Sequence, residues 1–285
     1  MKLQPIYRDC RQIPQLREHE GVPFFVFPAI EALGIAVHGF SPRLGGVSEG
    51  NFSSMNFSAG RGDRPEAVLE NFGRMAKAIG ADRDRMVVSW QTHTANIRLV
   101  TEEDAGKGVI YPRDYRDVDG LITNVPGITL VTLYADCVPI YLVDPVKKAV
   151  GLCHSGWRGT VKGISCETIK AMTAAYGTAP ADLTACIGPS ICVDCFEVGP
   201  EVAEEFLKAF PEAEPETLCP FWKETGKYHV DLWLANELML KRAGVEAGRI
   251  YTTGLCTRCN PKLLFSHRAM GEKRGNLGAF LGLRP

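Results

Sequence analysis

The middle of the chain constrains the fold more than any other part, because it holds apolar runs of strand length separated by a turn signature. Residues 128–134 alternate β-branched and apolar side chains, as a buried strand does. Residues 140–143 and 149–153 flank the turn-forming sequence at 144–147, which predicts an antiparallel hairpin. The chain is therefore expected to build a sheet around this segment.

Helical periodicity recurs on both sides of the hairpin. Apolar spacing predicts helices over residues 66–79, 161–176 and 231–243, and each is followed by a glycine and then by a short apolar run. Residues 1–20 are polar and are expected to form a loose N-terminal lead-in. No low-complexity segment or long linker divides the rest of the chain, and its length allows one large domain or two modest ones.

Composition excludes several classes of protein. The 285 residues include 32 Lys+Arg and 33 Asp+Glu, so the chain lacks the basic excess typical of nucleic-acid binders. No apolar stretch is long enough to span a bilayer, and the charged N-terminus does not resemble a signal peptide. We therefore expect a cytoplasmic protein. Its ten cysteines are then expected to be thiols, metal ligands or nucleophiles rather than disulfides.

The hairpin brings a cysteine and a histidine together. A turn centred on Pro145 and Val146 places Cys137 opposite His154, with Cβ atoms about 5 Å apart, although Pro139 must disturb the pairing. This distance suits two metal ligands or a nucleophile and its base. The alternative is that Cys137 simply fills the core, as free cysteines often do.

His93 is the third candidate ligand, because it follows the short apolar run that starts at Met86. Cys137, His154 and His93 would give three protein ligands and one open position, which is the arrangement of a catalytic zinc. Such an ion lowers the pKa of bound water toward about 7. Asp136 is a candidate general acid or base, with a structural role at a strand end as the alternative.

Two arginines are candidate anion ligands. Arg43 lies in the glycine-rich segment 38–48, and Arg158 lies where residues 154–160 lead into a predicted helix with free backbone N–H groups. We expect them to bind phosphate. A structural turn and a surface charge are the alternatives, since the glycine spacing matches no nucleotide-binding motif.

Two CxxC pairs occur, Cys192 with Cys195 and Cys256 with Cys259. Two such pairs are typical of a four-cysteine zinc site, but the gap between them is about 60 residues, whereas zinc ribbons use about 15 to 20. Their role, structural or otherwise, stays open on this ground.

An ordered series of motifs resembles a known family. The segments that carry the resemblance are residues 38–48, 56–58, 91–93, 119–123, 135–140, 154–160, 188–191, 196–199, 265–268 and 275–278, together with Asn260. The chain is identified as a member of the laccase-domain (multicopper polyphenol oxidase-like) family. This is also called a purine nucleoside phosphorylase family, and it includes the peptidoglycan editing factors.

The resemblance implies one domain of the α/β (α+β) class over residues 21–285. Its mixed β-sheets are flanked by helices, and its fold is similar to the deamidase domain of cytotoxic necrotising factors. The resemblance implies zinc, with copper as the alternative, on His93, Cys137 and His154. It also implies a metal-dependent enzyme whose partners are purine nucleosides and phosphate. Family activities are phosphorolysis of adenosine, inosine, guanosine and methylthioadenosine, and deamination of adenosine. A four-copper oxidase is hard to build from the six histidines present.

Three other functions remain open at this point. The first is a hydrolase that uses Cys137 as nucleophile and His154 as base. The second is a peptidoglycan editing hydrolase that acts on UDP-muropeptide precursors. The third is a non-enzymatic zinc-ribbon module built on the two CxxC pairs.

Overall fold

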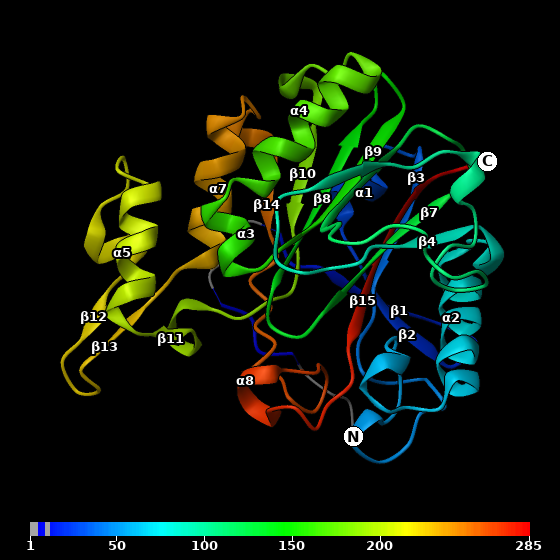
Figure 1. The fold of residues 1–285 in the computed structure, drawn as a ribbon, viewed down its shortest axis with the longest axis horizontal. Helices are drawn as coiled ribbons and strands as arrows, with labels where there is room; N and C mark the ends of the chain where they lie inside the picture. Colours follow the sequence, from blue (N-terminus) through cyan, green and yellow to red (C-terminus); the bar gives the residue numbers. More distant parts are fainter. Residues whose placement is uncertain (1–4, 9–11) are drawn as a thin grey trace.

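Two six-stranded sheets pack face to face, and helices cover their outer faces (Figure 1). The computed structural model describes residues 5–8 and 12–285. The first sheet has the order β1 (Gln15–His19), β2 (Val22–Val26), β3 (Ala36–Phe40), β15 (Leu277–Leu283), β7 (Thr129–Tyr134), β4 (Met86–Val88). The second has the order β14 (Ile250–Thr252), β10 (Thr184–Ile187), β8 (Val138–Asp144), β9 (Ala149–Ser155), β6 (Gly120–Thr123), β5 (Ile97–Leu99).

The longer helices form the outer layers. In Figure 1, α2 lies beside β1 and β2 of the first sheet, and α4 and α7 lie at the other side of the molecule. A small sheet of β11 (Glu197–Val198), β13 (Lys227–His229) and β12 (Phe221–Trp222) extends the α7 side together with α5. The helices are α1 (Pro28–Glu31), α2 (Pro65–Ile79), α3 (Trp157–Val161), α4 (Ile164–Tyr176), α5 (Pro200–Ala209), α6 (Pro215–Leu218), α7 (Leu232–Arg242) and α8 (His267–Met270).

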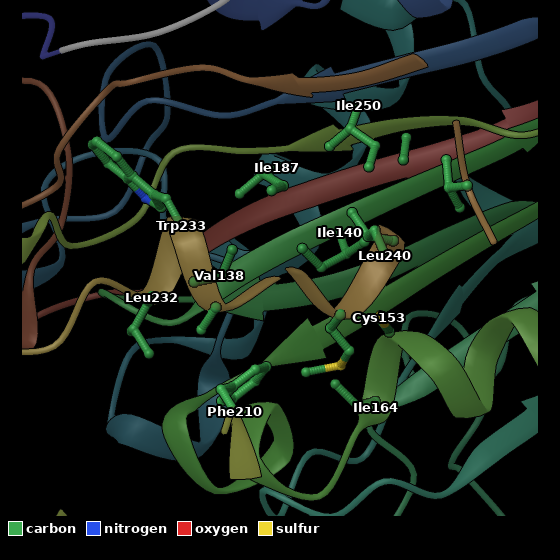
Figure 2. Close-up of a cluster of buried hydrophobic side chains, with 14 of the residues drawn as sticks. Val138, Ile140, Cys153, Ile164, Ile187, Phe210, Leu232, Trp233, Leu240 and Ile250 are labelled. Carbon is green, nitrogen blue, oxygen red and sulfur yellow. The ribbon is translucent and has the colours of Figure 1, made fainter. Parts of the chain in front are cut away.

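Strand periodicity explains the layers. Along β8, Ile140 and Leu142 point to the cluster shared with α4 and α7, which Figure 2 shows in close-up. Tyr141 and Val143 point the other way, into the core between the sheets. Because both faces of the central strands are covered, β8 and β9 are mostly apolar along their length rather than alternating with polar residues. This confirms the predicted single α/β domain with mixed sheets flanked by helices.

The helix predictions hold in position, with one interruption. Residues 66–79 and 231–243 correspond to α2 and α7. The helix predicted over 161–176 is α4, and a separate short helix, α3, precedes it because the chain turns at Gly163, where φ is +81°. Among the described residues, no helix is both long and apolar enough to cross a membrane.

The predicted lead-in is partly wrong. Residues 15–19 form β1, which pairs with β2 in the first sheet, although all five of its residues are exposed. Ile6 also donates its backbone N–H to the side chain of Asn260 at 2.8 Å. The predicted boundary at residue 20 therefore falls in the turn between two paired strands. The rest of the lead-in, residues 1–4 and 9–11, lies outside the described residues.

The predicted hairpin register is wrong by two residues. Asp144 pairs with Ala149, so the loop contains four residues rather than two. The cause is the Asp144 carboxylate, whose Oδ1 accepts hydrogen bonds from the backbone of Val146 and Lys147, each at 2.9 Å. His154 therefore pairs with Pro139 instead of Cys137. A shift by an even number leaves each side chain on its predicted face of the sheet.

Buried His38 on β3 predicts an acid-sensitive stability. Its Nε2 accepts the backbone N–H of Phe27 at 2.9 Å, and burial lowers the pKa of His38 to about 4. An unfolded histidine titrates near 6.5, so this contribution is present above pH 6.5 and is lost as the pH falls toward 4. We expect His38 to account for a loss of about 2 kcal/mol in unfolding free energy between pH 7 and pH 5.

Urea unfolding at both pH values checks this expectation. The variant His38→Gln keeps an acceptor without the titration, so its stability should change less with pH than that of the parent. His19→Gln, at an exposed histidine of β1, is the control and should behave like the parent. An unchanged pH dependence in His38→Gln would contradict the assignment.

Candidate metal centre

The three predicted ligands meet where the chain crosses from the first sheet to the second. Cys137 lies in the connection from β7 to β8, His154 lies on β9, and His93 follows β4. Their ligand atoms all lie within 4.8 Å of one another, and Cys137 Sγ is 3.9 Å from His93 Nε2. The arrangement brings one sulfur and two imidazoles to a common point, as a three-ligand metal site requires.

A buried carboxylate orients both histidines. Asp119, directly before β6, is fully buried, and its Oδ1 lies 2.8 Å from Nδ1 of His154 and 3.0 Å from the backbone nitrogen of His93. Its Oδ2 accepts hydrogen bonds from the backbone of Thr92 and from both the backbone and the hydroxyl of Thr94. Because Nδ1 of His154 donates to Asp119, Nε2 is left to bind a metal. Sequence reasoning quoted Asp119 only as part of a motif and missed this role.

The charges of the site favour a thiolate. Burial opposes ionisation of Cys137, but the charge and hydrogen bonding of His154 and His93 lower the pKa of the thiol to about 6. Burial likewise opposes the charge on His154, but Cys137 and Asp119 raise the pKa of His154 to about 9. Burial would protonate Asp119, yet its bonds to His154 and the loop amides hold its pKa well below the usual range. Thiolate is the form of cysteine that binds metals.

Gly156 leaves the space between the three ligands open. A Cβ at this position would lie 2.6 Å from Cδ2 of His93, 3.1 Å from Sγ of Cys137 and 3.4 Å from Cε1 of His154. Two neighbouring residues, His93 and Asp136, adopt positive φ values of +63° and +90°, which are unfavourable for side chains other than glycine. The donor set and this open space fit a zinc ion, and a Cys-His-His set also suits copper.

A cavity of about 650 Å³ opens beside the ligands. That volume is in the range of small-molecule sites. Its wall is cationic and aromatic: Arg61, Arg113, Arg268 and Arg274 line it together with Trp90, Tyr134, Trp157 and Phe196. Burial lowers the pKa of Arg274 to about 10, which still leaves it charged at neutral pH. The cavity can therefore attract an anion and offer flat apolar surfaces to a planar ring.

The two arginines predicted to bind phosphate do not line this cavity. The guanidinium of Arg43 donates to the backbone carbonyls of Ser53 and Pro261, each at 3.0 Å, and lies over the ring of Phe265. Arg158 is exposed and stacks on Trp157, whose own side chain does line the cavity. Arg113 and Arg274, which do line the cavity, also donate to backbone carbonyls, so such contacts alone do not rule out anion binding. Phosphate binding by Arg43 and Arg158 stays a prediction. No motif signalled Arg61, Arg113 or Arg274, whereas Arg268 belongs to a quoted motif.

Asp136 does line the cavity, but both of its oxygens already have partners. Oδ1 accepts the hydroxyl of Thr257 and Oδ2 accepts the backbone N–H of Arg268, each at 2.6 Å. Through these two bonds, Asp136 connects Thr257 and the start of α8 to the chain next to Cys137. Its role as general acid or base stays a prediction.

Comparison with known proteins agrees with this architecture. The family model described as multi-copper polyphenol oxidoreductase laccase matches residues 37–284. The chain belongs to this family. It is 38% identical over 252 residues to purine nucleoside phosphorylase YlmD of Geobacillus stearothermophilus, covering 87% of this chain and 90% of that protein.

Two further similarities extend the comparison. Adenosine deaminase RL5, from an unknown prokaryotic organism, is 37% identical over 242 residues, which is 84% of this chain and 91% of that protein. The crystal structure of the hypothetical protein YfiH from Bacillus licheniformis matches with a TM-score of 0.87 and 31% identity, covering 94% of this chain and 99% of that one. The relatives thus share the whole two-sheet domain rather than a fragment of it.

Gly156 provides a test of the metal centre that leaves every ligand in place. Its φ of −69° and ψ of 165° are open to alanine, so Gly156→Ala should fold. The added methyl group should lower the zinc affinity of the trio at least tenfold, since it occupies the space between the ligands. Competition with a chromophoric chelator measures this affinity.

Gly73→Ala on α2 is the matched control, because its Cβ would meet only the side chain of Arg83, at 3.8 Å. That variant should bind zinc like the parent. Undiminished affinity in Gly156→Ala would show that the metal is not held between these three side chains.

Proposed function

We propose that the protein is a zinc-dependent enzyme of purine nucleosides. Its reactions are phosphorolysis of adenosine, inosine, guanosine and methylthioadenosine, and deamination of adenosine. The observation that carries the proposal is that the Cys137, His93 and His154 trio opens onto a cationic, aromatic cavity of small-molecule size. Relatives named purine nucleoside phosphorylase and adenosine deaminase support the same substrate class.

The wall of the cavity suits both halves of a phosphorolysis. The bond from ribose C1′ to the purine nitrogen breaks, and an oxygen of phosphate bonds to C1′. Arg113 and Arg274 offset the charge of the phosphate, whereas Arg61 is already paired with Glu272. The rings of Trp157 and Phe196 offer faces on which the purine stacks. When bound, zinc supplies positive charge and lowers the pKa of a water molecule toward about 7.

Deamination uses the same cavity with water in place of phosphate. Water adds at C6 of adenine and ammonia leaves, so a group beside the ring must take up a proton and return it. Asp136 lies next to Cys137 and is the residue we assign to this transfer. Two reactions from one cavity require that loss of a metal ligand removes both.

A product assay tests the shared site. The protein is incubated with adenosine and phosphate, and adenine, inosine and hypoxanthine are separated by chromatography. We expect adenine and inosine from the parent and neither from Cys137→Ala, since this change removes the sulfur ligand. Retention of one activity in that variant would separate the two reactions, and absence of both products from the parent would contradict the proposal.

The arginine wall makes a second prediction. Arg113 lines the cavity beside Trp90, with its guanidinium 4.5 Å from the ring, whereas Arg158 lies outside the lining. The variant Arg113→Gln should raise the KM for phosphate at least tenfold, because it removes one positive charge from the anion site. Arg158→Gln is the matched control and should change this KM less than twofold. If Arg158→Gln raised the KM for phosphate and Arg113→Gln did not, the anion site would lie at the helix start near Arg158.

A cysteine hydrolase is the second candidate, and one observation favours it. Cys137, His154 and buried Asp119 form a chain in which Asp119 orients His154 toward the thiol, as in nucleophile–base–acid triads. Activity that survives chelation, with selective alkylation of Cys137, would support this function. Amidase activity on UDP-muropeptide precursors would identify the substrate as a cell-wall intermediate.

The oxidation of phenols is disfavoured by the positions of the histidines. His93, His154 and His267 line the cavity, whereas His19, His38 and His229 lie outside its lining. Besides the trio, the described residues form one other group suited to a metal, and that group contains only cysteines. A multi-copper oxidase needs many more imidazole ligands close together.

A further inference from the structure

The fold brings the two CxxC pairs together, although about 60 residues separate them. Cys192 and Cys195 flank a single 3₁₀ turn after β10, and Cys256 and Cys259 follow β14. Because β10 and β14 are parallel neighbours in the second sheet, the segments that leave their C-terminal ends run side by side. An isolated bridge between Ser190 and Cys256 continues this pairing. The four sulfurs all lie within 4.8 Å of one another.

The protein surrounds these sulfurs with hydrogen-bond donors. The backbone nitrogens of Cys192 and Cys259 donate to Sγ of Cys256, at 3.3 and 3.4 Å. Arg258 donates to Sγ of Cys195 at 3.4 Å, and Arg8 donates to Sγ of Cys259 at 3.6 Å. Four thiolates around a divalent ion carry a net charge of −2, and the two guanidiniums offset that charge. Arg8 also forms an ion pair with Asp194 at 2.6 Å. Donors of this kind stabilise the thiolate form of cysteine, which is the form that binds metals.

The spacing of the sulfurs favours a single ion. A zinc–sulfur bond of about 2.3 Å in a tetrahedron places the sulfurs about 3.8 Å apart. Cys195 Sγ and Cys259 Sγ are 3.5 Å apart, and no pair exceeds 4.8 Å. A disulfide would require about 2.05 Å, and all nine described cysteines are free. The set has room for one metal ion rather than for a cluster of several.

We propose that Cys192, Cys195, Cys256 and Cys259 hold a structural zinc ion, distinct from the ion of the trio. With four protein ligands and three of the cysteines buried, the site is closed. It joins the loop after β10, whose Ile191 and Phe196 form part of the cavity wall, to the loop after β14. Its function is to hold that wall in place.

Short contacts connect this site to the cavity. Phe196, next to Cys195, and Ile191, next to Cys192, both line the cavity. The hydroxyl of Thr257, next to Cys256, donates to Asp136 at 2.6 Å, and Ile191 donates its backbone N–H to the carbonyl of Asp136 at 3.0 Å. Movement of either CxxC loop would therefore shift Asp136, the residue next to Cys137. The cysteines are positioning residues in this proposal.

Metal analysis of the full-length protein separates the two sites. The parent, dialysed against metal-free buffer, should contain two zinc ions per chain, and Cys137→Ala should retain one. Cobalt(II) bound to Cys137→Ala should show the sulfur-to-metal charge-transfer absorption of a tetrathiolate. A Cys137→Ala protein without metal, or with iron in place of zinc, would overturn the proposal. One zinc in both proteins would support the structural site and refute the metal of the trio instead.

Variants of Cys259 keep the test independent of folding. Cys259 is half-buried at the rim, so Cys259→Ser should fold, lose one zinc and unfold at a lower temperature. Cys259→His restores a fourth ligand and should recover two zinc ions. Cys166→Ser, at another half-buried cysteine whose Sγ contacts the carbonyl of Met239, is the control and should keep two. Two zinc ions in Cys259→Ser would contradict the site.

Discussion

The carboxylate of Asp119 is the contact on which the rest of the centre depends. It accepts hydrogen bonds from the loop after β4, which belongs to the first sheet, and from His154 on β9, which belongs to the second. A buried carboxylate is costly unless donors satisfy both of its oxygens. Here the donors come from different sheets, so the two sheets must be docked before the charge is compensated. The ligand geometry is thus a consequence of the sheet packing.

The sequence was enough to predict the layers and the convergence of the three candidate ligands, for one physical reason. Strand periodicity is two, so the convergence of Cys137 and His154 did not depend on finding the correct pairing. The prediction missed the register by two residues because the side chain of Asp144 extends the turn. Such a contact changes the length of a loop without changing the faces of the strands that it joins.

The arginines that line the cavity and the cysteine cluster could not be predicted in the same way. Arg43 and Arg61 are both arginines in polar loops, and only tertiary structure shows that Arg43 donates to Ser53 and Pro261 while Arg61 faces the cavity. The gap between the CxxC pairs was measured along the chain, where α7 separates them. In a parallel pair of strands, a crossover helix is the ordinary link between neighbours, so a long gap does not imply a long distance. The short gap between cysteine pairs in compact zinc ribbons is therefore no guide to ligands that follow two neighbouring parallel strands.

The two clusters that could hold a metal ion differ in their ligand sets, and each set suits a different role. The trio has three ligands, an open cavity and a glycine at its centre, so a fourth position is free for a reacting group. The four cysteines would complete a tetrahedron around the proposed ion and leave no position for substrate. Asp136 lies between these sets, bonded to Thr257 on one side and adjacent to Cys137 on the other. These contacts favour a division in which the four-cysteine cluster would hold the wall and the trio would carry the chemistry, with Asp136 coupling the position of one to the other.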